Sequence, residues 1–134
     1  MFDFEGLEVT KDWRQSQTIH ARPEPKVIIA GAGMMTGGRI VGHAMHYLPF
    51  PTTRLMIVGY QGEGSLGREL LNGSSEVIIK GVRVPVKASV HDTQGLSSHA
   101  DQGQLMEWLK SINGVKKLIL THGDDHSRVG FKEK

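Results

Sequence analysis

The chain has 134 residues, within the usual size of one domain, and contains no cysteine, so any metal must be held by His, Asp or Glu. Its formal charge of +2 and pI near 9.0 permit a polyanionic partner without requiring one, because the basic residues are scattered along the chain. No apolar segment approaches the roughly 20 residues that cross a bilayer, and the N-terminus lacks a signal-peptide core, so we expect a cytoplasmic protein without membrane contact.

The first half alternates short apolar runs with glycine-rich turns. KDWRQSQTIH predicts a short helix capped by Thr10, and Lys26–Ala30 (KVIIA) predicts a buried strand that ends in a tight turn. Apolar positions at helical spacing predict a helix over Gly37–Leu48. Arg54–Val58 is a second strand of the buried type, and a short helix follows near Leu66–Leu71.

The second half predicts a hairpin, a helix and a last strand. Glu76–Ile79 and Val82–Val86 flank the dipeptide KG, which is typical of a hairpin turn, and Lys87–Val90 is a further candidate strand. An apolar stripe predicts a helix that starts near Asp101, and Lys117–Leu120 predicts the last strand. Strands alternating with helices indicate an α/β fold, with a largely parallel sheet flanked by helices.

The turn GAGMMTGGRI, Gly31 to Ile40, joins the first predicted strand to a helix whose free N–H groups attract anions. It is not a Walker motif, because Arg39 and Ile40 stand where Lys and a hydroxyl residue are required. It is not a dinucleotide fingerprint either, because Thr36 replaces the third glycine. A purely structural turn remains an equal alternative.

Two histidines lie directly beside predicted elements, at positions where an imidazole could take part in a functional site. His99, in the motif SSHAD, lies where a loop enters a helix and could donate to an anion, although for a lone histidine simple exposure beside a helix cap is the stronger reading. His122 directly follows the strand LIL, and the glycine after it lets the ring face a cleft. The alternative is a solvated loop, since HGDDH alone is a weak metal signal.

The other histidines are weaker candidates for a functional site. His43 and His46 lie beside the apolar face of the helix predicted over Gly37–Leu48, so packing is favoured over ligation. His20 and His91 have no partner that the sequence identifies.

Four stretches in order, VIIAGAGMMTGGRI, VGYQGEGSLGREL, GLSSHAD and LTHGD, carry a family resemblance. Together they closely resemble the C-terminal part of the β-CASP group of metallo-β-lactamase-fold RNA nucleases, which includes ribonuclease J and the endonuclease of mRNA 3′-end processing. The resemblance implies that residues 1–95 belong to a β-CASP lobe. Residues 96–134 would then supply the last strand and helix of the metallo-β-lactamase lobe, the RNA-specificity region.

The resemblance also implies roles for individual residues. His99 looks like the histidine that stands beside the scissile phosphate, and His122 like the last ligand to one of two zinc ions. The glycine turn would face RNA, and we expect contacts from Arg68 as well. The RNA- or phosphate-binding residues implied in this way are Gly31, Gly33, Met34, Gly37, Gly38, Arg39, Ser97 and Ser98.

The chain also departs from the family pattern. Ala32 replaces the usual serine of the glycine turn, and the His-x-His-x-Asp-His motif that binds most of the metal does not occur in these residues. We therefore expect a C-terminal fragment of a zinc-dependent RNA-processing phosphodiesterase, with weak zinc binding and little activity alone. Its expected partners are RNA and the missing N-terminal metallo-β-lactamase portion, with a second copy of the chain as a further candidate.

Two alternatives remain open at this point. The chain could be a non-catalytic RNA-binding or regulatory module derived from such an enzyme. The parent enzyme could also act on a substrate other than RNA, since the same fold serves several hydrolases.

Overall fold

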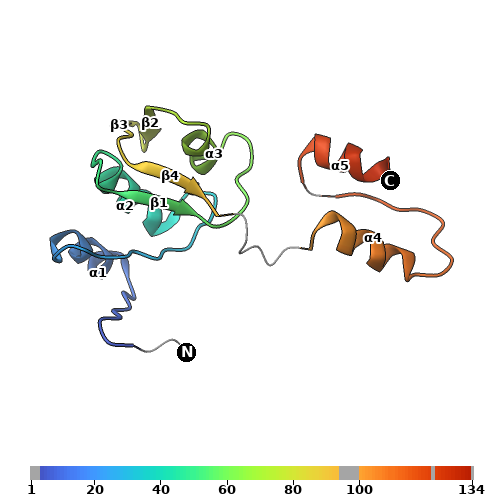
Figure 1. The fold of residues 1–134 in the computed structure, drawn as a ribbon, viewed down its shortest axis with the longest axis horizontal. Helices are drawn as coiled ribbons and strands as arrows, with labels where there is room; N and C mark the ends of the chain where they lie inside the picture. Colours follow the sequence, from blue (N-terminus) through green and yellow to red (C-terminus); the bar gives the residue numbers. More distant parts are fainter. Residues whose placement is uncertain (1–3, 94–99, 122, 134) are drawn as a thin grey trace. The chain divides into compact units, whose positions relative to one another are not determined.

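The computed structural model describes residues 4–93, 100–121 and 123–133 (Figure 1). The chain divides into two compact units, Met1–Gly95 and Leu96–Lys134. The described residues of the first unit contain helices α1 to α3 and strands β1 to β4, and those of the second contain α4 and α5. The assignment of each unit to one lobe of the parent fold stays a prediction.

Helix α1 (Trp13–Thr18) continues directly into a short 3-10 helix, η1 (Ile19–Ala21). The Asp12 carboxylate accepts a hydrogen bond from the backbone N–H of Gln15 at 2.9 Å, which satisfies one of the free N–H groups of the first turn. The prediction that Thr10 caps this helix is wrong, because Asp12 is the residue directly before the helix.

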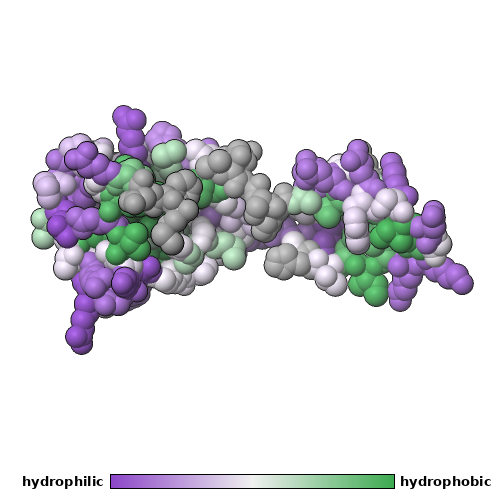
Figure 2. Space-filling model, turned by 90° about the horizontal axis from the view of Figure 1, so that it is seen from below, coloured by the Kyte–Doolittle hydropathy of each residue, from purple (hydrophilic) through white to green (hydrophobic). Residues whose placement is uncertain are grey.

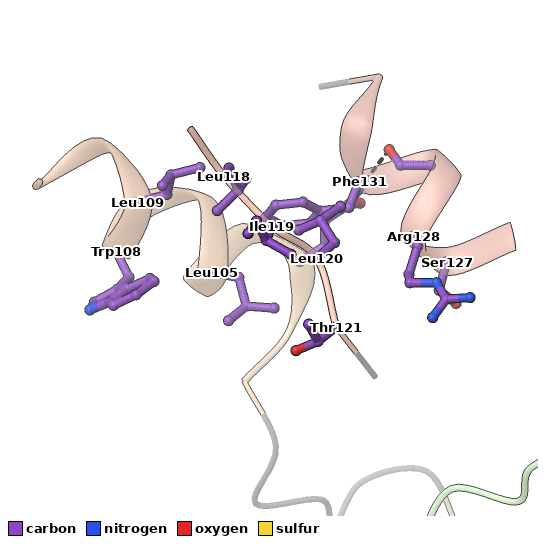
Figure 3. A pocket seen from close by; sticks show the side chains of 12 residues that line it. Leu105, Trp108, Leu109, Leu118, Ile119, Leu120, Thr121, Ser127, Arg128 and Phe131 are labelled. Carbon is purple, nitrogen blue, oxygen red and sulfur yellow. Dashed lines mark hydrogen bonds between the residues drawn. The ribbon is translucent and has the colours of Figure 1, made fainter. Parts of the chain in front are cut away.

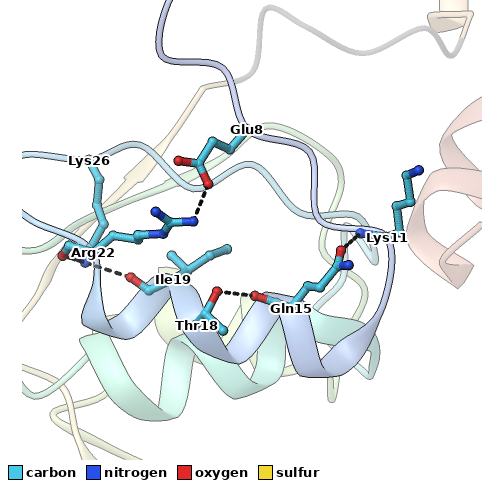
Figure 4. A network of polar contacts seen from close by, with 7 residues as sticks. All are labelled: Glu8, Lys11, Gln15, Thr18, Ile19, Arg22 and Lys26. Carbon is cyan, nitrogen blue, oxygen red and sulfur yellow. Dashed lines mark hydrogen bonds and ion pairs between the residues drawn. The ribbon is translucent and has the colours of Figure 1, made fainter.

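Polar contacts hold the segment that surrounds α1 and η1 (Figure 4). The Lys26 ammonium donates to the carbonyl oxygens of Ile19 at 2.9 Å and Arg22 at 2.7 Å, and so satisfies acceptors at the end of η1. Arg22 donates in turn to the Glu8 carboxylate at 2.7 Å. Both partners of this last pair are exposed, so it contributes little to stability.

Helices α2 (Gly38–Tyr47) and α3 (Leu66–Leu71) form where the sequence predicts them. The Ser65 hydroxyl caps α3 by accepting from the backbone N–H of Arg68 at 3.2 Å. Gly37 precedes α2 and supplies no side chain, so the first N–H groups of α2 have no side-chain cap.

Strands β1 (Arg54–Ile57) and β4 (Ser89–Asp92) pair in parallel. Strand β4 begins two residues after the predicted start at 87, because the N–H groups of residues 87 and 88 both donate to the carbonyl of Leu48, at 2.8 and 3.0 Å. A parallel sheet flanked by helices confirms the predicted α/β class (Figure 1).

The hairpin predicted around the KG dipeptide is present. Strands β2 (Glu76–Ile79) and β3 (Val82–Pro85) are antiparallel, joined by Lys80 and Gly81. These two residues have φ values of 53° and 79°, the positive pair that a type I′ turn requires.

The core of the first unit lies between α2, α3 and the hairpin. Leu48, Leu70 and Val77 are each 1% exposed. Partly buried Leu55 of β1 and Val90 of β4 pack against this cluster, which places the parallel pair beside it. The buried members are Met35, Val41, Ala44, Leu48, Leu70, Val77, Ile79, Val84 and Ala88.

Residues 26–30 form no strand, contrary to the prediction of a buried one. Val27 and Ile29 are 89% and 93% exposed. The apolar run has the composition of a strand, but a strand also needs a neighbour that pairs with its N–H and C=O groups. No strand within the described ranges of the chain pairs with it.

The second unit contains α4 (Gln102–Lys110) and α5 (Asp125–Lys132). As predicted, α4 starts after Asp101. The Asp101 carboxylate accepts from the backbone N–H of Gln104 at 2.8 Å, and the Gln104 side chain accepts from the backbone N–H of Asp101 at 2.9 Å, which completes a capping box.

The last predicted strand, residues 117–120, is not formed in this unit. This segment runs between the two helices, and the three together line an apolar groove of about 780 Å³ that includes Leu105, Trp108, Leu118 and Phe131 (Figure 3). None of the described residues of α4 or α5 is buried. Hydrophobic side chains therefore remain at the surface of this unit (Figure 2).

Within the described ranges, the helices are all too short or too polar to cross a bilayer.

Candidate functional site

Two glycine-containing turns lie together in the first unit. The first glycine turn, residues 31–38, leads into α2, and the second, residues 59–65, connects β1 to α3. The Gln61 side-chain amide donates to the Gly33 carbonyl of the first turn at 2.7 Å and to the Gly59 carbonyl of the second at 2.9 Å. The second turn leaves the carboxyl end of a parallel strand, which is where α/β folds bind ligands.

The first glycine turn has a backbone that most residues adopt reluctantly. Ala32 and Met35 have positive φ values of 65° and 56°, and the N–H of Met35 donates to the Ala32 carbonyl at 2.8 Å. Gly38 also has positive φ, 71°, and a Cβ there would lie 3.1 Å from the Cβ of Ala32. Glycine is therefore strongly favoured at position 38.

The open side of this turn is uncrowded. A Cβ built on Gly31, Gly33 or Gly37 would meet no atom within 4 Å. Because the first N–H groups of α2 have no side-chain cap, this surface offers backbone donors to an anion.

Gln61 fits its place only because residue 67 is a glycine. Gln61 is 1% exposed, and a Cβ on Gly67 would lie 1.7 Å from its Oε1. The N–H of Gly67 also donates to the Met34 carbonyl at 3.4 Å, which links α3 to the first turn. Gln61 and Gly67 together fix the two turns relative to each other.

Arg68 also stabilises the second turn. Its Nε and Nη2 donate to the carbonyl of Gln61 at 2.9 and 2.6 Å, and its guanidinium carbon lies 6.0 Å from the centre of the Tyr60 ring. Ser65 donates to the Gly62 carbonyl at 2.7 Å. Arg68, which the family resemblance implies as an RNA contact, is thus partly buried, and its guanidinium is bonded within the turn.

One group of predicted site residues lies within the described part of the chain, in and directly after the first glycine turn. Most members of the first glycine turn are exposed, as is Arg39, whose guanidinium donates to Thr10 through the carbonyl at 2.7 Å and the hydroxyl at 3.1 Å. The remaining predicted residues lie outside the described residues: Ser97, Ser98, His99 and His122.

A comparison with protein families decides the class of the chain. The Beta-Casp domain family matches residues 1–70, which is more than half of the sequence. The chain belongs to the Beta-Casp family. A second family, described as the Zn-dependent metallo-hydrolase RNA specificity domain, matches residues 83–134.

Relatives of this Beta-Casp chain include two proteins with ribonuclease names and a transcription termination factor. It is 42% identical over 120 residues to Ribonuclease TTHA0252 of Thermus thermophilus, covering 90% of the chain and 27% of the relative. It is 34% identical to the transcription termination factor FttA of Methanocaldococcus jannaschii, covering 82% of the chain and 18% of the relative. An RNase J-like protein of the same archaeon is 32% identical, with 81% and 25% covered.

These matches place the Beta-Casp chain in a family of RNA-processing metallo-hydrolases that includes ribonucleases. The chain spans about a quarter of the length of the Thermus relative. The resemblance read from the four sequence motifs is confirmed.

The second family implies zinc, but the described residues of this Beta-Casp chain do not fit a zinc site by themselves. They contain no group of three or more His, Asp or Glu side chains placed to hold a metal. Asp125 and His126 of the HGDDH motif lie in α5 and are exposed, where Asp125 pairs with Arg128. They are exposed, as the alternative interpretation of this motif expected, but they lie in a helix and not in a solvated loop.

Three histidines that the sequence did not connect form a cluster on α2 and η1. His43 is 4% exposed, and its Nε2 lies 2.8 Å from the Ser16 hydroxyl, while its Nδ1 lies 3.2 Å from Nε2 of His20. The rings of His20 and His46 stack at 4.0 Å. Packing on the α2 face is as predicted for His43, and only the fold could give His20 its partners.

We expect this cluster to make the first unit less stable in acid. Burial, and then the neighbouring His46, His43 and Lys26, hold the pKa of His20 below its ordinary 6.5. Burial, followed by Arg39 and His46, lowers the pKa of His43 in the same way. Below pH 6.5 the unfolded chain binds protons that the folded unit resists, so the free energy of unfolding decreases as the pH falls.

We therefore expect the urea midpoint of the first unit to be lower at about pH 5.5 than at about pH 7.5. His20→Phe, which keeps a stacked ring without a titrating group, should reduce this difference. His91→Gln, at an exposed position in β4, should leave it unchanged. A midpoint that is the same at both pH values in the unsubstituted protein contradicts the expectation.

Proposed function

We propose that the chain provides the RNA-binding part of a zinc-dependent RNA-processing phosphodiesterase. The observation that carries this proposal is the pair of glycine turns braced by Gln61, whose open side offers backbone N–H groups next to the end of β1. Phosphate groups bind at such helix-leading turns. The description of the second matched family as an RNA specificity domain supports RNA as the ligand.

In this proposal two histidines outside the described residues carry the chemistry. His99, with Ser97 and Ser98 beside it, lies against the scissile phosphate, and His122 is one ligand of a zinc ion. The His-x-His-x-Asp-His ligands are absent from the 134 residues. They come from a metallo-β-lactamase portion outside this sequence, and the chain alone binds zinc weakly and does not cleave RNA.

RNA binding is tested on the first glycine turn. Gly33→Val places a side chain on the open surface, where its Cβ would meet no atom within 4 Å, and keeps the carbonyl that Gln61 uses. We expect it to weaken binding of a single-stranded oligoribonucleotide, measured by fluorescence anisotropy, with an unchanged urea midpoint. Wild-type affinity should fall as salt rises, as phosphate contacts require. Equal affinity of variant and wild type removes the turn from the RNA site.

Catalysis is tested by supplying the corresponding N-terminal portion of the Thermus ribonuclease together with the chain. We expect RNA cleavage only in the mixture, and we expect dialysed His122→Ala mixtures to retain less zinc. His99→Ala should lose turnover while RNA binding stays. RNA binding without cleavage in the mixture favours the non-catalytic module, and cleavage by the chain alone contradicts the proposal.

A further inference from the structure

Tyr60 and Met34 come from different glycine turns and converge on one glycine. Tyr60 is 55% exposed and Met34 is 45% exposed. A Cβ on Gly62 would lie 3.6 Å from the Met34 sulfur and 3.9 Å from Cε1 of Tyr60. An aromatic ring and a thioether therefore flank a stretch of bare backbone, and we call these three residues the Gly62 platform.

The platform is held in place by the contacts that fix the two turns. The side chain of Gln61, between Tyr60 and Gly62 in the chain, bonds to Gly33, the residue before Met34. The guanidinium of Arg68 lies 6.0 Å from the centre of the Tyr60 ring and bonds to the Gln61 carbonyl. The exposed Tyr60 ring therefore has a cation near it, and a shift of either turn relative to the other would break a partly buried hydrogen bond.

The chemistry of the platform fits a nucleobase better than a phosphate. An exposed aromatic ring stacks on a base of any sequence, and a thioether adds favourable contacts at a ring edge. The exposed carboxylate of Glu63 is in the same turn, which disfavours a phosphate at this point of the surface. The backbone donors that suit a phosphate belong to the neighbouring first turn.

We infer that the Gly62 platform stacks one unpaired base of the RNA strand, with the Tyr60 ring as the stacking surface and Met34 at its edge. This inference rests on the proposed RNA-binding function and adds a base contact to it. It predicts that the site distinguishes single-stranded RNA from a ribose-phosphate chain without bases.

The test uses the 134-residue chain and two probes, a labelled single-stranded oligoribonucleotide and an abasic oligomer of the same length. Tyr60→Ala should weaken binding of the base-containing probe about tenfold, as is usual for loss of one stacked base, and leave the abasic probe unchanged. Tyr60→Phe keeps the ring and should bind as the wild type does. Gly62→Ala, which adds a methyl group at ordinary contact distance, should weaken only the base-containing probe.

Phe50→Ala is the matched control, because Phe50 is also an exposed aromatic residue of the first unit, at 48% exposure, and lies outside both turns. It should not change either affinity. If the wild type binds RNA and Tyr60→Ala binds equally well, the platform is overturned while the proposed function stands. If the wild type binds neither probe, the proposed function fails and the platform fails with it.

Discussion

Replacing Gly67 by alanine is expected to lower the free energy of unfolding of the first unit by about 3 kcal/mol. The new methyl group would lie 1.7 Å from Oε1 and 2.5 Å from Cδ of Gln61, which is 1% exposed. Gln61 would have to leave its place, and the carbonyls of Gly33 and Gly59 would lose their donor. Urea unfolding followed by Trp13 fluorescence, in a Trp108→Phe background, measures this loss.

A matched control and a double variant separate the clash from a general effect of alanine. Gly59→Ala adds the same methyl group in the second turn, where no atom lies within 4 Å, and should change stability little. Gln61→Ala combined with Gly67→Ala should be less destabilised than the sum of the single variants, because the clash disappears with the side chain. Additive losses would show that the two residues do not interact.

Leu70→Ala is expected to cost about 2–5 kcal/mol, the usual range for a leucine truncated in a packed core. Leu70 is 1% exposed and belongs to the cluster that joins α3 to the hairpin. The same fluorescence measurement applies. Ile78→Ala, on the solvent side of β2 at 66% exposure, is the control and should cost much less. Similar losses for both variants would contradict the assignment of Leu70 to the buried core and of Ile78 to the exposed face of β2.

Elements that depend on local chemistry were predictable from sequence. The KG dipeptide supplies the positive φ pair of the hairpin, and Asp101 with Gln104 supplies both halves of a capping box. The strands predicted at 26–30 and 117–120 were not, because an apolar run does not reveal whether a partner strand lies beside it. Strand pairing depends on the tertiary structure, whereas the pattern of apolar residues shows only that a segment is suited to a strand.

The candidate site was predictable in part for the same reason. The glycines of the first turn were identified because glycine marks unusual backbone geometry. Gln61 was missed, since nothing in GYQGEG indicates that its amide bonds to Gly33, 28 positions earlier. The one available signal was Gly67, an unexplained glycine inside a helix, which is where another side chain often approaches closely.

The described part of the second unit buries little apolar surface that heating could expose. Its described helices bury no side chain, and the groove of Figure 3 is lined by Leu105, Trp108, Leu109, Leu118 and Leu120. The heat-capacity change of unfolding scales with the apolar surface that becomes exposed. In a calorimeter, the cooperative transition of this chain therefore belongs to the first unit, and the second contributes a shallow slope in place of a peak.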